Sequence, residues 1–88
     1  MGTVRVSARP WSWYVWIETV DSAQQIRSQL VGKLTDIPGV GIMAEVFGHG
    51  YDPSTVIGRY HSLASARRAV VREYKRRFPD WFEELVRP

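Results

Sequence analysis

The stretch "WSWYVWIETV", residues 11–20, decides the fold because four large aromatic rings stand within six of its residues. Its aromatic and β-branched side chains favour extended structure, so the stretch predicts a β-strand. Successive side chains of a strand point to opposite faces of a sheet. The strand therefore has two rows: Trp11, Trp13, Val15 and Ile17 on one face, and Ser12, Tyr14, Trp16 and Glu18 on the other. Because both rows contain large rings, the strand serves two faces at once.

Residues 21–34, "DSAQQIRSQLVGKL", predict a first helix after this strand. Asp21 is a suitable N-cap, and Gln24 follows three residues later, as in a capping box. The proline and glycine of "TDIPG", residues 35–39, would end the helix. Its apolar residues recur at the spacing of one helical stripe: Ala23, Ile26, Leu30, Val31 and Leu34.

Residues 62–78 predict a second helix, with Ser62 as the N-cap. Two further strands are expected at residues 40–48, which alternate in polarity, and at residues 55–61. The turn signal "GHGYDPS" separates them. The apolar stripe of the second helix consists of Leu63, Ala66, Val70, Val71, Tyr74 and Phe78.

The two halves of the chain repeat one another. "IPGV" at 37–40 and "FPDW" at 78–81 both follow an amphipathic segment, and an offset of about 40 residues superposes the two helical stripes. Residues 80–87 fit a short helix or an edge strand, and the repeat favours a fourth strand. We therefore predict an α+β fold of ferredoxin-like βαββαβ order, with an antiparallel four-stranded sheet and two helices on one face. Residues 1–88 form one domain, with 1–10 as a flexible or strand-extending segment.

In such a fold one face of the sheet has no helix over it. If the Trp13 row meets the helices, an apolar set is left on the other face, and monomers seldom expose so large a patch. We therefore expect a homodimer that pairs sheet against sheet. A stacking platform for nucleic-acid bases and a platform for a sugar chain are the alternatives. The set consists of Tyr14, Trp16, Met43, Phe47 and Ile57.

The order of these motifs resembles the ligand-binding domain of the Lrp/AsnC transcription regulators over residues 13–87. The likeness lies in the "PGV" of residues 38–40 and in a Gly-x-Tyr-Asp type of turn, matched by Gly48, Tyr51 and Asp52. It implies a dimeric α/β barrel with a small effector between subunits near the second turn. Residues expected at this interface site are Tyr14, Trp16, Met43, Phe47, His49, Tyr51 and Asp52.

Two weaker likenesses concern shorter segments. "VIGRYHSLASARRAV", residues 56–70, is similar to the second half of a SPOR domain, which implies glycan binding. "LTDIPGVGIMAEVF", residues 34–47, is similar to a helix-hairpin-helix DNA-binding hairpin, although the alternation of residues 40–47 favours a strand.

Positive charge is concentrated in the second helix. Residues 62–78 contain six basic side chains and one acid, a local charge of +5, whereas the whole chain has +3. At 100° per residue, Arg68, Arg72, Lys75 and Arg76 form one outward stripe that could follow phosphates. A solvated helix face is the ordinary interpretation of such a stripe, and nucleic-acid binding is the alternative.

Several classes of protein are disfavoured. The sequence has no cysteine, which excludes disulfide scaffolds and thiolate metal sites. His49 and His61 have no acid at ligand spacing, so neither a metal nor another cofactor is expected. No nucleophile motif, phosphate loop or dinucleotide fingerprint is present, which favours a non-enzymatic role without catalytic residues. No apolar run is long enough to span a bilayer, so we expect no membrane association and a cytoplasmic location.

The leading functional hypothesis from the sequence is a small non-enzymatic domain. It would dimerise through its sheet and bind a small ligand or a regulatory partner at the interface. Nucleic-acid binding by the basic face of the second helix is the first alternative, and SPOR-like glycan binding is the second.

Overall fold

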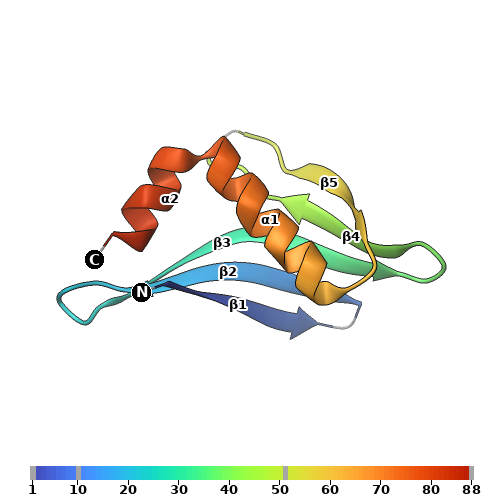
Figure 1. Cartoon of the computed structure of the whole chain (residues 1–88), viewed down its shortest axis with the longest axis horizontal. Helices are drawn as coiled ribbons and strands as arrows, with labels where there is room; N and C mark the ends of the chain where they lie inside the picture. Colours follow the sequence, from blue (N-terminus) through green and yellow to red (C-terminus); the bar gives the residue numbers. More distant parts are fainter. Residues whose placement is uncertain (1, 10, 51, 88) are drawn as a thin grey trace.

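A computed structural model describes residues 2–9, 11–50 and 52–87, including the side chain of Val4 but no other side chain of residues 2–9. Five antiparallel strands form one sheet in which each strand pairs with its neighbours in sequence, and two helices follow (Figure 1). The elements are β1 (Gly2–Arg9), β2 (Ser12–Val20), β3 (Ile26–Ile37), β4 (Gly41–Val46), β5 (Thr55–Tyr60), α1 (Leu63–Arg77) and α2 (Pro79–Val86).

The α+β class, the antiparallel sheet and the presence of two helices are confirmed. The strands expected around residues 11–20, 40–48 and 55–61 are present as β2, β4 and β5, and the second predicted helix is α1. Ser62 is its N-cap, because its hydroxyl oxygen accepts a hydrogen bond from the backbone N–H of Ser65 at 3.1 Å.

The predicted order βαββαβ is wrong, because the first expected helix is the strand β3. Asp21 does not cap a helix. Its carboxylate oxygen Oδ1 accepts hydrogen bonds from the backbone N–H groups of Ala23 and Gln25, both at 2.9 Å, and so closes the turn between β2 and β3. Gln24 has a φ of 62° in this turn, a left-handed conformation that does not occur inside a helix.

A β-bulge explains why β3 resembles a helix in sequence. Val15 pairs with Gly32 and the next residue, Trp16, pairs with Leu30, so Val31 is an extra residue in β3. The bulge changes which face later residues occupy. Val31 and Leu34 are therefore both buried at a spacing of three, which a helical stripe also produces.

The fourth strand expected at residues 80–87 is also wrong, since Pro79–Val86 is the helix α2. Proline is favourable at the first position of a helix, where no backbone N–H donor is required. The "PGV" of residues 38–40 follows β3 and lies in the hairpin turn before β4, rather than after a helix. The element order implied by the Lrp/AsnC likeness is thus absent.

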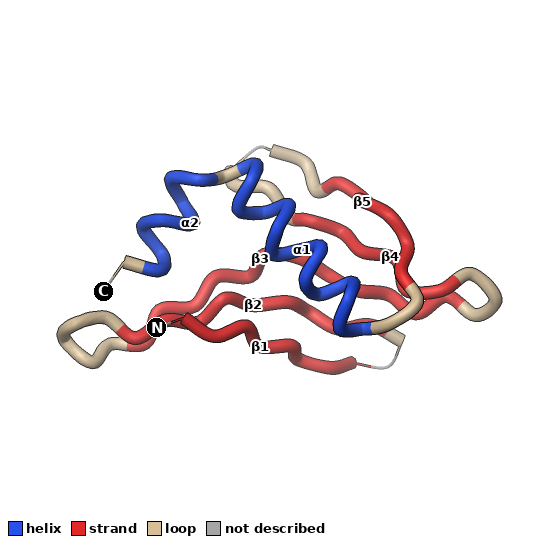
Figure 2. The backbone as a smooth tube through the Cα atoms, viewed as in Figure 1, coloured by secondary structure: helices blue, strands red, loops and turns tan. Residues whose placement is uncertain are grey.

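Both helices lie on one face of the sheet (Figure 2). Helix α1 crosses β3, β4 and β5 and closes the core with Ala66, Val70 and Tyr74. The helix approaches closely at Gly32, where a Cβ atom would lie 2.5 Å from Val70 Cγ1. From the sheet, the buried side chains are Val15, Ile17, Val31, Leu34, Ala44 and Val46.

Polar contacts hold α2 on the sheet near its C-terminal end. The Thr19 hydroxyl of β2 donates a hydrogen bond of 2.7 Å to the carbonyl oxygen of Leu85. The Arg27 guanidinium of β3 donates to the carbonyl oxygens of Glu84 and Arg87, at 3.2 and 2.6 Å. A cation at this position also complements the negative end of the helix dipole. Arg27 therefore anchors the C-terminal end of α2 to β3.

Candidate functional site

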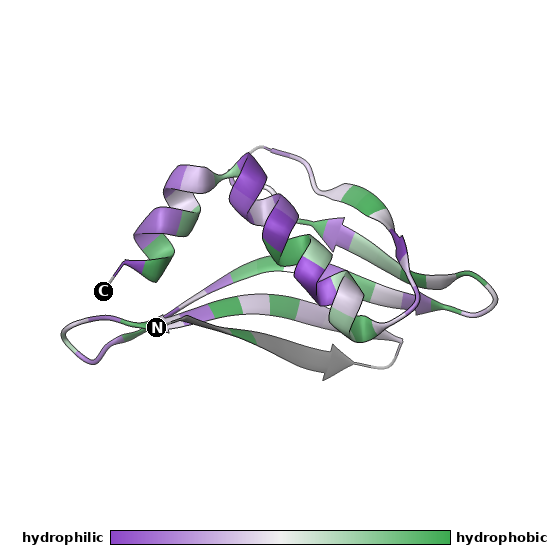
Figure 3. Cartoon of the chain, in the orientation of Figure 1, coloured by the Kyte–Doolittle hydropathy of each residue, from purple (hydrophilic) through white to green (hydrophobic). Residues whose placement is uncertain are grey.

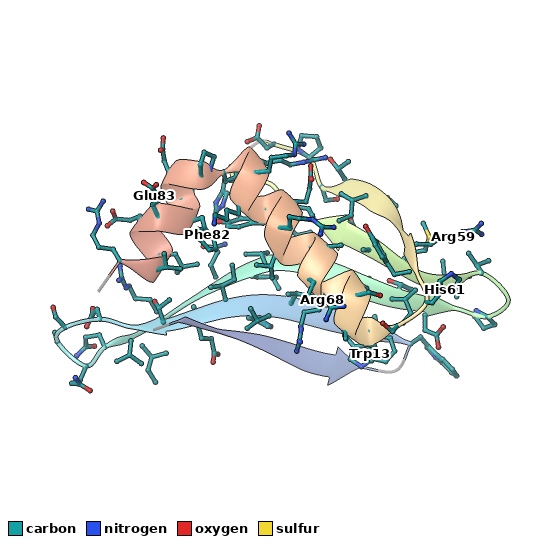
Figure 4. The ribbon with its side chains drawn as sticks, viewed as in Figure 1. Trp13, Arg59, His61, Arg68, Phe82 and Glu83 are labelled. Atoms are coloured by element: carbon teal, nitrogen blue, oxygen red, sulfur yellow. The ribbon has the colours of Figure 1, made fainter. Side chains whose placement is uncertain are left out.

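A groove with a volume of about 690 Å³ lies between α1 and β1. The helix contributes cations to it at four positions, together with the apolar side chain of Val71, and β1 contributes Val4. Figure 4 shows Arg68 extending from α1 on this side. We name it the basic groove, and its lining consists of Val4, Arg67, Arg68, Val71, Arg72 and Lys75.

A second hollow of about 330 Å³ adjoins the basic groove, because Arg72 and Lys75 line both. It continues toward α2, where Phe82 provides an apolar wall and Lys75 Nζ lies 5.3 Å from the Phe82 ring centroid. The same stripe of cations therefore borders both hollows. Figure 3 shows hydrophilic bands along α1 next to this region. The second lining consists of Arg72, Lys75, Arg76, Pro79, Phe82 and Glu83.

The charge of the basic groove is not neutralised within the described residues. Arg67, Arg68 and Arg72 form no ion pair or hydrogen bond with any described side chain. Arg68 and Arg72 are also exposed. Three uncompensated guanidinium groups and the Lys75 ammonium group therefore produce a strongly positive potential over an apolar floor.

The acid of α1, Glu73, is engaged elsewhere. Its carboxylate accepts hydrogen bonds from Arg76 and from Arg77, the latter at 2.8 Å. These two bonds lower the pKa of Glu73 from 4.5 to about 2, so the carboxylate is fully ionised at neutral pH. Because Glu73 holds Arg76 and Arg77, the four cations of the basic groove have no counter-charge among the described side chains.

Only some of the interface residues expected from the sequence lie on the same face of the sheet. By strand pairing, Tyr14, Trp16 and Met43 lie on the face of the sheet opposite the helices, as expected. Ile57 does not, because a second bulge makes it an extra residue between the pairs Ala44–Gly58 and Glu45–Val56. Ile57 packs against the core instead. Phe47 follows the end of β4 and is half-buried.

His49 lies on the helix side of the molecule, away from the expected site. Its ring stacks on Trp81 with centroids 4.3 Å apart, and its Nε2 atom is hydrogen-bonded to the Tyr74 hydroxyl at 2.6 Å. Burial raises the pKa of Tyr74, so this hydroxyl keeps its proton well above neutral pH. Asp52 is exposed in the loop that follows, and Tyr51 lies outside the described residues. The predicted ligand site is therefore not assembled on one face.

Sequence reasoning identified Arg68, Arg72 and Lys75 of the groove, and it missed Arg67 and the apolar floor. Val71 was assigned to the core stripe, and it lies at the margin between core and groove. Val4 was not placed beside the helix, because residues 1–10 were expected to be a flexible or strand-extending segment. The pairing of Val4 with Ile17 of β2 brings it to the helix-covered face.

Other kinds of site receive no support from the described residues. They contain no group of three His, Asp or Glu side chains that could hold a metal ion. His61 lies just before α1, exposed, whereas His49 is held between the helices. No helix within the described ranges is long and apolar enough to cross a membrane.

No family model matches the sequence, and no curated protein or solved structure is significantly similar to it. The function therefore has to be argued from the site alone.

Proposed function

We propose that the basic groove along α1 binds the phosphate backbone of nucleic acid. The observation that carries the proposal is the clustering of four uncompensated cations around one groove, Arg67, Arg68, Arg72 and Lys75. Acids three or four residues away would stabilise such a row of cations on a solvated helix face, and Arg67, Arg68 and Arg72 have no such partner among the described residues. Here the single acid of the helix is bound to Arg76 and Arg77, neither of which lines the basic groove.

The spacing of the cations suits a row of phosphates. At a rise of about 1.5 Å per residue, Arg72 lies about 6 Å along the helix from Arg68, and Lys75 about 4.5 Å further. Arginine adds bidentate hydrogen bonds to phosphate oxygens, and three of the four cations are arginine. The apolar floor formed by Val4 and Val71 suits the sugar edges that lie between phosphates.

The proposed binding is largely independent of base sequence. Neither Asn nor Gln, the side chains that read adenine, lines either hollow, and the proposal assigns the arginine and lysine side chains, which can read guanine, to phosphates. Phosphate contacts fix orientation and supply affinity without carrying sequence information. We therefore expect similar affinities for duplexes of different base composition.

Titration by fluorescence anisotropy at several salt concentrations tests the proposal. Four phosphate contacts predict a slope of log Kobs against log salt of about −3.6 for duplex DNA. The double variant Arg68→Gln/Arg72→Gln should lower affinity at least about tenfold at about 0.1 M salt and halve the slope. The matched control is Lys33→Gln/Arg59→Gln, which removes the same charge from the sheet face opposite the helices and should bind like the wild type.

Equal losses in the two double variants would mean that only net charge matters, and the groove assignment would fail. Binding that is absent at low salt, or that does not respond to salt, would remove the proposed function altogether.

The hypothesis of a small ligand at a sheet-to-sheet interface has lost part of its support. Tyr14, Trp16 and Met43 share the helix-free face, which favours self-association. His49 and Asp52, which were to complete the ligand site, lie elsewhere. Self-association through the sheet is therefore retained as a proposal, separately from ligand binding.

A further inference from the structure

We propose that two copies of this chain pair through their helix-free sheet faces, and that the pair holds two nucleic-acid segments together, one on each outer side. The second half of this inference rests on the proposed function of the basic groove. The first half rests on the chemistry of the opposite face, which the groove does not involve.

The helix-free face has an apolar centre. Trp16 of β2 pairs with Leu30 of β3, and Tyr14 stands two residues from Trp16 on the same face. Met43 of β4 continues the apolar surface, and Val56 of β5 has 56% of its surface exposed. No described helix covers any of these side chains. A surface of this kind is typical of protein interfaces, where aromatic side chains and methionine are enriched.

The described charges that β2 to β5 place on this face are equal in number. Lys33 and Arg59 contribute two cations, and Glu18 and Glu45 contribute two acids, among the described side chains of β2 to β5. These described charges sum to zero, whereas the four cations that line the basic groove have no acid beside them in its lining. A second copy is the matching occupant, because a two-fold interface places the same apolar patch of both copies against each other.

The size of the face suits a pair. Five strands at about 4.8 Å spacing, with about 25 Å of strand length each, give a flat area on the order of 600 Å² per copy. Two copies would bury on the order of 1,200 Å², the lower limit for a stable protein interface. We therefore expect a dimer that forms in the micromolar range and not an obligate one.

Pairing through the sheets places the two basic grooves far apart. Each groove lies beside α1, on the helix-covered side of its own sheet. Stacked sheets are about 10 Å apart and each helix layer adds about 10 Å, so the grooves face away from each other across about 30 Å. One straight duplex cannot reach both grooves, and the pair therefore joins two separate segments.

Mass measurement by light scattering tests the pairing. The wild type should approach twice the chain mass of 10.1 kDa as concentration rises through the micromolar range. Val56→Glu, which adds a charge beside Glu45 at an exposed position, should remain monomeric without disturbing the fold. Trp16→Glu should have the same effect and acts at the centre of the face.

Val40→Glu is the matched control for Val56→Glu. Val40 lies in the turn between β3 and β4 and has 43% of its surface exposed, so the same chemical change is made away from the sheet face. This variant should dimerise like the wild type. A wild type that stays monomeric up to about 100 μM, or a Val56→Glu variant that dimerises normally, would overturn the pairing.

A bridging experiment tests whether the dimer holds two nucleic-acid segments together. Beads with an immobilised duplex are mixed with a fluorescent duplex and the protein, and the fluorescence retained on the beads is measured. The wild type and Val40→Glu should retain it, whereas Val56→Glu should bind duplex in anisotropy titrations but retain at least about tenfold less. Arg68→Gln/Arg72→Gln should still dimerise and should fail in both assays.

The outcomes separate the two proposals. Absence of binding in anisotropy removes the proposed function while the mass measurement still decides the pairing. Normal binding by a dimer that retains no fluorescent duplex would overturn bridging alone. Equal bridging by the monomeric Val56→Glu variant would show that the sheet face has no part in it.

Discussion

Residues 21–37 and 62–77 have similar amphipathic patterns, and only the second segment is a helix. Both begin at a residue whose side-chain oxygen accepts backbone hydrogen bonds. Ser62 accepts from the N–H three residues ahead, which starts α1. Asp21 accepts from the N–H groups two and four residues ahead, which reverses the chain into β3. The same residue chemistry therefore caps a helix in one place and closes a hairpin in the other.

The interior of each segment resolves this ambiguity. Helix α1 contains three alanines and no glycine, and alanine has the highest helix propensity. Strand β3 contains Gly32, which costs about 1 kcal/mol in a helix relative to alanine. The comparison teaches that spacing of apolar residues alone does not distinguish a helix from a bulged strand. Residue types within the stripe have to be weighed with it.

The two segments meet at Gly32, and a bulky substitution there should have the largest effect. In Gly32→Val, the new Cβ atom would lie 2.5 Å from Val70 Cγ1 and closer still to the Glu45 carbonyl oxygen. We expect a loss of about 3 kcal/mol in the free energy of unfolding, although valine is the better strand former. Urea denaturation followed by circular dichroism measures it.

Ser28→Val is the control for this substitution, since Ser28 is exposed on the same strand. It should change stability by no more than about 0.5 kcal/mol. A Gly32→Val variant as stable as the wild type would show that α1 does not approach β3 as closely as the structure has it.

Removing the N-cap of α1 should have the next largest effect on the free energy of unfolding. Ser62→Ala deletes the acceptor of the Ser65 N–H and should lower the free energy of unfolding by about 1 kcal/mol. Ser62→Asp restores an acceptor and should recover most of the loss. A loss with Ser62→Asp as large as that with Ser62→Ala would contradict the capping role. Thermal or urea unfolding of the three proteins measures this.

The fold could be predicted from the sequence where the composition and the apolar pattern of a single segment indicate the same element. β2 and α1 were found because aromatic or alanine-rich composition agrees with the pattern. β3 was not found because the bulge at Val31 imitates a helical stripe. For α2, the internal repeat was given more weight than Pro79, whose place at a helix start is itself a local signal. The repeat was a coincidence of spacing and not a repeat of structure.

The candidate site was predictable to a similar extent. Arg68, Arg72 and Lys75 were identified because their stripe depends only on the geometry of a single helix. Val4 and Phe82 were not, because their place beside that stripe depends on how β1 and α2 pack. The position of His49 depends in the same way on Trp81 and Tyr74, which are distant in sequence.

The ion pairs of Glu73 provide a pH-dependent test of the helical segment. Glu73 reaches Arg76 and Arg77 at spacings of three and four, which only a helix brings together. Its pKa is lowered from 4.5 to about 2, so its contribution to stability is complete above pH 4.5 and is lost as the pH falls toward 2. In urea unfolding, the wild type should lose more stability than Glu73→Gln between about pH 5.5 and about pH 3.

The pairs are partly exposed, so the difference should be small. Glu83→Gln, a change at an exposed acid of α2, is the control and should follow the wild type. If Glu73→Gln also follows the wild type through this range, the ion pairs do not persist in solution.

The smallest expected effect is a change in the free energy of unfolding whose sign shows whether residues 21–34 form a hairpin or a helix. Gln24 has a φ of 62° in the turn before β3, a conformation that costs about 1 kcal/mol or more for a residue with a Cβ atom and little for glycine. Gln24→Gly should therefore raise the free energy of unfolding by about 0.5 kcal/mol, after allowance for the greater freedom of glycine in the unfolded chain. If residues 21–34 were a helix, glycine would lower it by about 1 kcal/mol. Paired urea titrations of Gln24→Gly and Gln24→Ala measure the sign of this change. Alanine should stabilise a helix, and it should not relieve the backbone strain at residue 24 of the turn.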